Sequence, residues 1–217
     1  MKQNWSSYIQ DLSDFPEGDS TWEKQFMQTV LSYIPKDNIN KVLEVGCSNG
    51  RWLRWFNKEY KSAVFGVDND STGFKKDDII SFASADALNL PYDSQSFDLV
   101  FSLGLVEHFR KGDKLRILKE QCRVLKKKGY LICQTPKLDL SLNYLYMKIA
   151  YDLRQGTRHF ITTPGELSRY IKELGLEIIF NSPIGCLREI EVFKKIKKVG
   201  LFSKLFSTET LIIARKI

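Results

Sequence analysis

Two glycines with three residues between them follow a short apolar run, in Glu44-Val45-Gly46-Cys47-Ser48-Asn49-Gly50. Glycine lets a backbone turn tightly and come close to a ligand. The amides at the beginning of a helix, which is predicted to start directly after this segment, favour an anionic group such as a carboxylate. The segment therefore predicts a loop that binds a small ligand.

The spacing of these glycines argues against a dinucleotide as that ligand. A dinucleotide-binding loop needs glycine at its first, third and sixth positions. Counting from Gly46, the third position is Ser48 and the sixth is Arg51. Packing of a pyrophosphate against this loop would therefore be compromised.

The chain has two histidines that could move a proton during catalysis. His108 follows Glu107 just beyond a predicted strand, so we consider it the general base or the group that orients an acceptor. His159 is a second candidate. The alternatives are a helix-start residue bonded to a backbone carbonyl for His108 and a surface-loop residue for His159. One glutamate beside one histidine does not make a metal site, so no metal is predicted.

The elements that must position these residues alternate between strands and helices. Strands are predicted at 41–46, 63–68, 79–83, 97–102, 129–134, 176–180 and 210–214, and helices at 21–34, from 51, at 112–127 and at 164–174. A short helix is expected between the second and third strands. Near-continuous apolar strands of this kind predict an α/β fold with a doubly wound parallel sheet.

Length and composition fit one globular domain. The chain has 217 residues, of which 43% are hydrophobic and 27% charged, with a net charge of +7. We expect a single domain over 1–217, with an N-terminal arm and helix at 1–35, a cofactor-binding half at 41–136 and an acceptor-side half at 137–217. No apolar run approaches the roughly 20 residues that span a bilayer, and the first residues lack a signal-peptide core. A cytoplasmic protein with free cysteines is therefore expected.

The pattern acidic-x-Gly-x-Ser-x-Gly resembles the glycine-rich loop of class I S-adenosylmethionine-dependent methyltransferases, whose usual form has a third glycine where Ser48 stands. The resemblance continues in order along the chain through Gly66-Val67-Asp68, Ala85-Asp86-Ala87, Leu105-Val106-Glu107-His108-Phe109 and Val124-Leu125-Lys126-Lys127-Lys128-Gly129. It spans Val42 to Pro136. It implies a Rossmann-like sheet of seven mostly parallel strands with helices on both faces.

The same resemblance implies S-adenosyl-L-methionine as cofactor and assigns residues to it. Asp68 would hold both ribose hydroxyls, which suits a carboxylate because it accepts two hydrogen bonds at once. Asn69 would lie beside the adenine, Asp86 would accept a hydrogen bond from the exocyclic amine, and the Ala87 amide would contact the ring. The remaining cofactor-binding residues are Glu44, Gly46, Cys47, Ser48 and Gly50 in the loop, and Ser102 in the fourth-strand motif.

We therefore expect methyl transfer to a small-molecule acceptor, with oxygen favoured, as in relatives of ubiquinone biosynthesis. Two alternatives stay open: an RNA-directed methyltransferase and a cofactor-binding regulatory protein without turnover. Ser102-Leu103-Gly104-Leu105 stands where an Asn/Asp-Pro-Pro-aromatic motif would indicate methylation of a base or amide nitrogen. With no appended RNA-binding module that we recognise, nucleic acid is not the expected partner.

A basic insertion at 187–206 interleaves lysines with apolar residues. A basic amphipathic helix is typical of contact with an anionic membrane surface. RNA is a second partner if basic and aromatic groups share one face. The alternative is a solvated helix that covers the edge of the sheet. The oligomeric state is not predicted.

Overall fold

The computed structural model describes residues 21–70, 72, 74, 78–136, 160, 162–184 and 209–217. Four α-helices and one 3-10 helix lie in this part of the chain: α2 (Thr21–Tyr33), α3 (Arg51–Tyr60), η1 (Val106–His108), α4 (Lys111–Val124) and α6 (Pro164–Glu173). The strands are β1 (Lys41–Val45), β2 (Ala63–Asp68), β3 (Ile80–Ser84), β4 (Phe97–Leu103), β5 (Leu125–Pro136), β6 (Leu176–Ile184) and β7 (Glu209–Lys216).

The seven strands form one sheet in the order β3-β2-β1-β4-β5-β7-β6. β1 to β5 pair in parallel, whereas β7 is antiparallel to both β5 and β6. Strand order reverses between β1 and β4, so the topological switch point lies at their carboxyl ends, where open α/β sheets bind their ligands. The predicted α/β class and mostly parallel sheet are confirmed.

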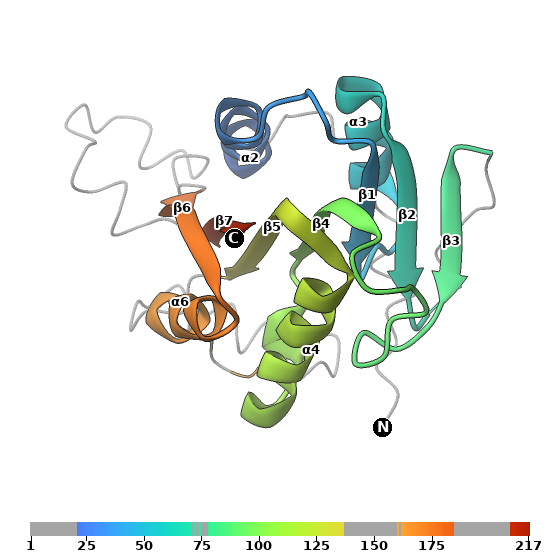
Figure 1. The fold of residues 1–217 in the computed structure, drawn as a ribbon. Coiled ribbons are helices and arrows are strands. Elements are labelled where there is room, and N and C mark those ends of the chain that lie inside the picture. Colours follow the sequence, from blue (N-terminus) through green and yellow to red (C-terminus); the bar gives the residue numbers. More distant parts are fainter. Residues whose placement is uncertain are drawn as a thin grey trace, which may run out of the picture.

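Helices cover both faces of this sheet (Figure 1). On one face, α3 packs on β1 and β2, and α2 packs on β6 and β7; on the other, α4 packs on β4 and β5, and α6 packs on β6. The first face is dominated by aromatic residues: Phe26, Trp52, Trp55, Phe56 and Phe101 are each 6% exposed or less. Because both faces are buried, the central strands can be almost wholly apolar.

Local sequence explains where individual helices begin and end. α3 buries Trp52, Leu53, Trp55 and Phe56 on one face, and it ends where Lys61 adopts a left-handed φ of 56°. α6 begins after Thr163, whose side chain accepts a hydrogen bond from the Glu166 amide at 3.1 Å. Such a cap satisfies one of the amides that a helix start leaves without a partner.

One prediction about the bounds of an element was wrong in detail. The helix expected to continue to 127 ends at Val124, and Leu125, expected on its apolar face, begins β5. Leu125 pairs with Phe97 of β4 instead. The amides of Gln95 and Ser96 donate to the Arg123 and Val124 carbonyls, so strand pairing between β4 and β5 begins directly after α4. The short helix expected between β2 and β3 stays a prediction, because only residues 69, 70, 72, 74, 78 and 79 of that connection are described.

Several predictions fall outside the described residues: the arm at 1–20, His159 and the basic insertion at 187–206. The division into cofactor-binding and acceptor-side halves also stays a prediction. Within the described part of the chain, no helix has the length and hydropathy needed to cross a membrane.

Candidate active site

The loop after β1 turns at two glycines that both have left-handed backbone angles. Gly46 has φ of 79° and Gly50 has φ of 75°. A Cβ atom at Gly46 would lie 2.9 Å from the Leu105 side chain, and one at Gly50 would lie 2.5 Å from Ile80. The loop also bonds to β2, since the Gly46 amide donates to the Val67 carbonyl at 2.7 Å. The left-handed conformation favours glycine at both positions, and a side chain there would also displace Leu105 or Ile80.

Ser48 occupies the position where the resembled loop has a third glycine. It adopts a left-handed φ of 49°, which is uncommon for a residue with a side chain. Its amide donates to Oδ2 of Asp68 at 2.9 Å, while its Oγ is buried without a hydrogen-bond partner. A buried hydroxyl without a partner is costly unless a ligand completes its hydrogen bonding.

Asp68 lies at the carboxyl end of β2, directly across from this loop. In addition to the Ser48 amide on Oδ2, its Oδ1 accepts the Asp70 amide at 3.0 Å. Burial raises the pKa of Asp68, although its backbone hydrogen bonds oppose that rise. These bonds hold the carboxylate at the edge of the sheet and leave lone pairs on its oxygens for a ligand. Asn69 follows it at the same edge.

Glu44 lies beneath the loop and is 3% exposed. Burial raises its pKa well above the ordinary value, the charge of Asp68 adds to the rise, and Arg51 opposes it. Arg51 itself forms a buried ion pair with Glu23 of α2 at 2.6 Å. Oε2 of Glu44 has no hydrogen-bond partner, so it can accept one from a ligand or from a water that the ligand holds.

Cys47 reaches the site only through its backbone. Its side chain points into the core, where the sulfur lies 2.7 Å from the place that a Cβ on Gly66 would take. Burial raises the pKa of the thiol well above its usual range. The thiol therefore packs as a small apolar group, and the Cys47 amide bonds to the Val67 carbonyl at 3.1 Å.

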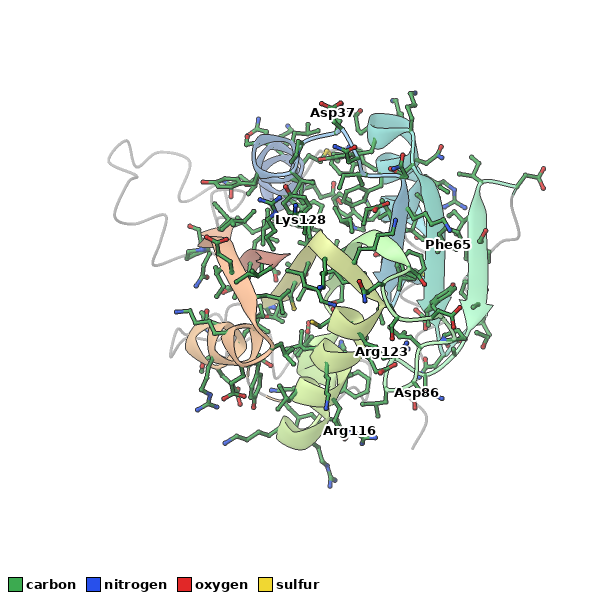
Figure 2. The ribbon with its side chains drawn as sticks, viewed as in Figure 1. Asp37, Phe65, Asp86, Arg116, Arg123 and Lys128 are labelled. Carbon is green, nitrogen blue, oxygen red and sulfur yellow. The ribbon has the colours of Figure 1, made fainter. Side chains whose placement is uncertain are left out.

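Asp86 and Ala87 follow β3, and the segment that carries them is tied to the end of β2. The Ala85 amide donates to the Asp68 carbonyl at 3.1 Å. Asp86 is exposed and its Oδ1 accepts the Leu88 amide at 2.9 Å, whereas Ala87 is buried. Figure 2 places Asp86 at the lower end of the sheet, to which the arrowheads of β2 and β3 point. The structure thus brings the loop after β1, Asp68 and Asp86 to one edge.

Ser102 is not brought to that edge by its side chain. It is fully buried in β4, and its hydroxyl faces Gln121 of α4 at 3.5 Å and the Cys133 sulfur at 3.9 Å. The reason is the alternation of side chains along a strand, which turns this position toward α4. A ligand at the edge would meet the backbone beyond Ser102 rather than its hydroxyl.

His108 ends the 3-10 helix η1, which follows β4 at the same edge. It is half-buried, and its amide donates to the Leu105 carbonyl at 3.1 Å. It thus lies beyond the carboxyl end of β4, next to the switch point, where the sequence places an acceptor. His159, the other candidate, lies outside the described residues, but the Phe160 amide donates to the Glu107 carbonyl at 2.6 Å.

The sequence does not predict a second, half-buried carboxyl near Glu107, that of Glu209. Glu209, at the start of β7, is held by the Gln134 side chain. Burial raises the pKa of Glu107 and of Glu209 to about 8 each, the charge of Glu107 adds to the rise at Glu209, and Lys114 of α4 opposes the rise at Glu107. Oε2 of Glu107 is buried without a hydrogen-bond partner. No local sequence pattern predicts that Glu107 and Glu209 lie near each other, because β7 pairs with β5 only in the folded sheet.

The described residues offer no cluster of side chains for binding a metal ion. Among these residues the structure holds no group of three or more histidine, cysteine, aspartate or glutamate side chains that could bind a metal ion. The absence of a metal stays a prediction for the whole chain.

Comparison with known proteins matches residues 43–133 to the family described as a methyltransferase domain. The chain is 31% identical over 107 residues to tocopherol O-methyltransferase of Arabidopsis thaliana, covering 45% of this chain and 30% of that protein. It is also 31% identical over 96 residues to "Probable tRNA methyltransferase 9B" of Mus musculus, covering 42% and 20%.

A solved complex extends the likeness of the fold to nearly the whole chain. A Haloferax volcanii methyltransferase structure, determined with the Trm112 methyltransferase activator, superposes with a TM-score of 0.73 at 17% identity and covers 99% of this chain and 98% of the other. The chain spans only 20–36% of the length of three curated relatives to which it is 31% identical.

The sheet order, the glycine loop and Asp68 define the class I methyltransferase fold. Residues 43–133 match a methyltransferase domain, and the fold is that of solved S-adenosylmethionine-dependent methyltransferases, as the sequence predicts. Enzymes of this class use S-adenosylmethionine as the methyl-donating cofactor.

Proposed function

We propose that this chain transfers the methyl group of S-adenosylmethionine to an oxygen atom of a small-molecule acceptor. One observation carries the proposal: the Asp68 carboxylate is bonded to the Ser48 amide of the glycine loop at the switch edge. This arrangement supports a role for Asp68 in holding the ribose diol and for the adjacent loop in binding the amino-acid end of the cofactor. The oxygen preference is supported by the likeness to tocopherol O-methyltransferase.

The residues of the loop fit such a cofactor. Gly46 and Gly50 adopt the left-handed backbone angles that turn the loop back toward the end of β2. The buried Ser48 Oγ and Glu44 Oε2 both lack partners and would bond to the amino-acid end, directly or through water. Asp68 would hold the ribose, and Asp86 with the Ala87 amide would recognise the adenine. When bound, the cofactor supplies a methyl group already activated by the positive charge of its sulfonium.

The chain then has two tasks, alignment and proton removal. Holding an acceptor in line with the methyl group supplies on the order of 7–11 kcal/mol in the best cases. His108, half-buried beyond β4, would accept the proton of the acceptor hydroxyl, and a positioned base contributes roughly 10²–10⁴-fold in rate.

RNA is the second candidate acceptor. It is favoured by the likeness to the tRNA methyltransferase 9B of mouse and by the net charge of +7. Binding to RNA that weakens steeply as salt is raised, together with methyl transfer to that RNA, would favour this candidate. Transfer to small phenols or carboxylic acids without RNA binding would favour the proposal.

Calorimetry with S-adenosylmethionine and S-adenosylhomocysteine tests cofactor binding directly. We expect both to bind, with the affinity for S-adenosylhomocysteine weakened in a variant without the Asp68 carboxylate. A panel of hydroxyl, amine and carbon acceptors, assayed for radiolabelled methyl transfer, then tests the reaction. Tight binding with no transfer to any acceptor or RNA would instead indicate a regulatory protein, and no binding would overturn the proposal.

A further inference from the structure

The segment at 85–92 carries Asp86 and Ala87 and is anchored at both of its ends. At its start, the Ala85 amide bonds to the Asp68 carbonyl at 3.1 Å. At its end, the Tyr92 ring packs against Phe65 and Phe97, with ring centroids 6.1 and 4.9 Å away. Figure 2 labels Phe65 on β2 and Asp86 on the segment below it. The position of the tip of this segment, at Asp86 and Ala87, therefore depends on what holds the residues between Ala85 and Tyr92.

The tip is a turn built by Asp86 itself. Its Oδ1 accepts the Leu88 amide at 2.9 Å, and its backbone carbonyl accepts the Asn89 amide at 2.9 Å. Such a turn fixes the direction of the carboxylate relative to the local backbone. It does not fix where the turn lies relative to the sheet, so a second contact must do so.

That contact comes from Glu120 and Arg123 on α4, which we call the α4 clamp. Their side chains pair through two hydrogen bonds, Nε to Oε1 and Nη2 to Oε2, both 2.9 Å long. The clamp then bonds to the segment three times. Glu120 Oε2 accepts the Leu90 amide at 3.1 Å, Arg123 Nη2 donates to the Leu90 carbonyl at 3.1 Å, and Nη1 donates to the Tyr92 carbonyl at 2.8 Å.

A neighbouring pair on the same helix provides a comparison. Arg116 and Asp113 have the same i,i+3 spacing, but their side chains are 65% and 38% exposed, against 33% and 20% for Arg123 and Glu120. Among the hydrogen bonds of the described residues, Arg116 and Asp113 make none to the segment. Figure 2 places Arg123 toward the segment that carries Asp86 and Arg116 farther along the helix. The α4 clamp therefore differs from an ordinary exposed ion pair on a helix, because it is less exposed and bonds to the segment at 85–92.

We propose that Glu120 and Arg123 are positioning residues for base recognition, holding Asp86 and the Ala87 amide where they distinguish adenine from a base without the exocyclic amine. The inference rests on the proposed function, in which this segment recognises adenine. Fixed acceptors reject a ligand that lacks the matching donor, because a polar group is then left unpaired. Loss of the clamp frees three backbone groups of the segment, so the tip loses its fixed position.

The test compares the affinities of two nucleosides by calorimetry: S-adenosylhomocysteine and its deaminated analogue S-inosylhomocysteine, which has an oxygen in place of the amine. We expect the unmodified protein to prefer the first by about tenfold or more. In Arg123→Ala the preference should fall to about twofold or less, since the segment is no longer held. Arg123→Lys should keep part of this preference, because a lysine can donate to one carbonyl of the segment but cannot reproduce the paired guanidinium hydrogen bonds.

Arg116→Ala is the matched control and should keep the full preference. Circular dichroism and thermal unfolding establish that each variant is folded, and Glu120→Gln replaces Arg123→Ala if the latter does not fold. A folded clamp variant with an unchanged preference would overturn this inference alone. Failure of the unmodified protein to bind S-adenosylhomocysteine would overturn the proposed function as well.

Discussion

The amide of Ser48 donates a hydrogen bond to Oδ2 of Asp68 at 2.9 Å, which joins the loop after β1 to the end of β2. Two neighbouring strands are thereby locked together at the point where their ligand is expected. Because this bond orients the carboxylate, it needs little rearrangement when a sugar binds. Preorganisation of this kind raises affinity by lowering the cost of ordering the site.

Asp68→Asn should weaken the binding of S-adenosylhomocysteine by about 10–100-fold, the effect of losing charge-assisted hydrogen bonds. The amide oxygen of asparagine can still accept the Ser48 amide, so the loop should stay in place. Calorimetry measures the affinity. Asp37→Asn is the control, because Asp37 is exposed and precedes β1 at the opposite edge (Figure 2). Equal affinities in the two variants would contradict the role of Asp68.

His108→Ala should lower kcat by about 100-fold or more while leaving the affinity for S-adenosylmethionine within about twofold. The reason is that a base acts on the acceptor proton and makes no contact with the cofactor's sugar or base. The measurement pairs steady-state kinetics on the acceptor found in the panel with calorimetry. An unchanged kcat would remove His108 from the mechanism and support a purely structural role.

The free energy of unfolding should fall as pH rises from about 5 to 8. Burial raises the pKa of Glu107 and Glu209 to about 8, above the value of roughly 4.3 for an unfolded glutamate. Between these pKa values the folded protein keeps protons that the unfolded chain releases, so rising pH favours unfolding. In Glu107→Gln the side chain cannot titrate, so the free energy of unfolding should depend less on pH. This variant should exceed the unmodified protein in free energy of unfolding by the largest amount near pH 8.

Denaturant titrations at pH 5, 6, 7 and 8 measure that slope. Glu173→Gln is the control, since Glu173 is 51% exposed on α6 and pairs only loosely with Arg169 at 3.9 Å. Its slope should match that of the unmodified protein. A Glu107→Gln variant with the same slope as this control would show that Glu107 is ionised in the folded state throughout.

Lys128→Gly should raise the free energy of unfolding by about 0.5–1 kcal/mol. Lys128 is exposed and has a left-handed φ of 62° within β5, a conformation that glycine adopts without strain. Thermal or denaturant unfolding measures the change. Lys127→Gly is the matched control: its φ is not left-handed, so glycine there should destabilise by roughly 0.5–1 kcal/mol. If Lys128→Gly and Lys127→Gly both lowered the free energy of unfolding, the claim that the backbone is strained at Lys128 would be contradicted.

Much of the fold follows from local pattern. The apolar run ending at Gly46 and the acid closing the next strand at Asp68 predict two strand ends, and the parallel arrangement places them at one edge. Leu125 was misassigned because its apolar character fits a helix face and a buried strand equally well. Only the pairing with Phe97, a contact distant in sequence, decides between them.

The parts of the site that the sequence does not predict are all non-local. The charge of Glu107 acts on Glu209 because β7 pairs with β5, and no spacing in the sequence indicates that pairing. The opposite charges of Glu120 and Arg123 at i,i+3 do predict an ion pair on a helix face. Their bonds to Leu90 and Tyr92 depend on how α4 packs against the sheet, so the pair alone gives no reason to connect it with the segment at 85–92.

The placement of β7 sets an order on assembly of the sheet. β6 precedes β7 along the chain, yet β7 lies between β5 and β6, so β6 has no neighbour in the sheet until β7 is present. The two strands must therefore join the parallel strands as an antiparallel unit, or β7 must dock first and receive β6 afterwards. Until then the open side of β5 is an unprotected strand edge, and an intermediate stalled at this stage would be prone to associate with another chain.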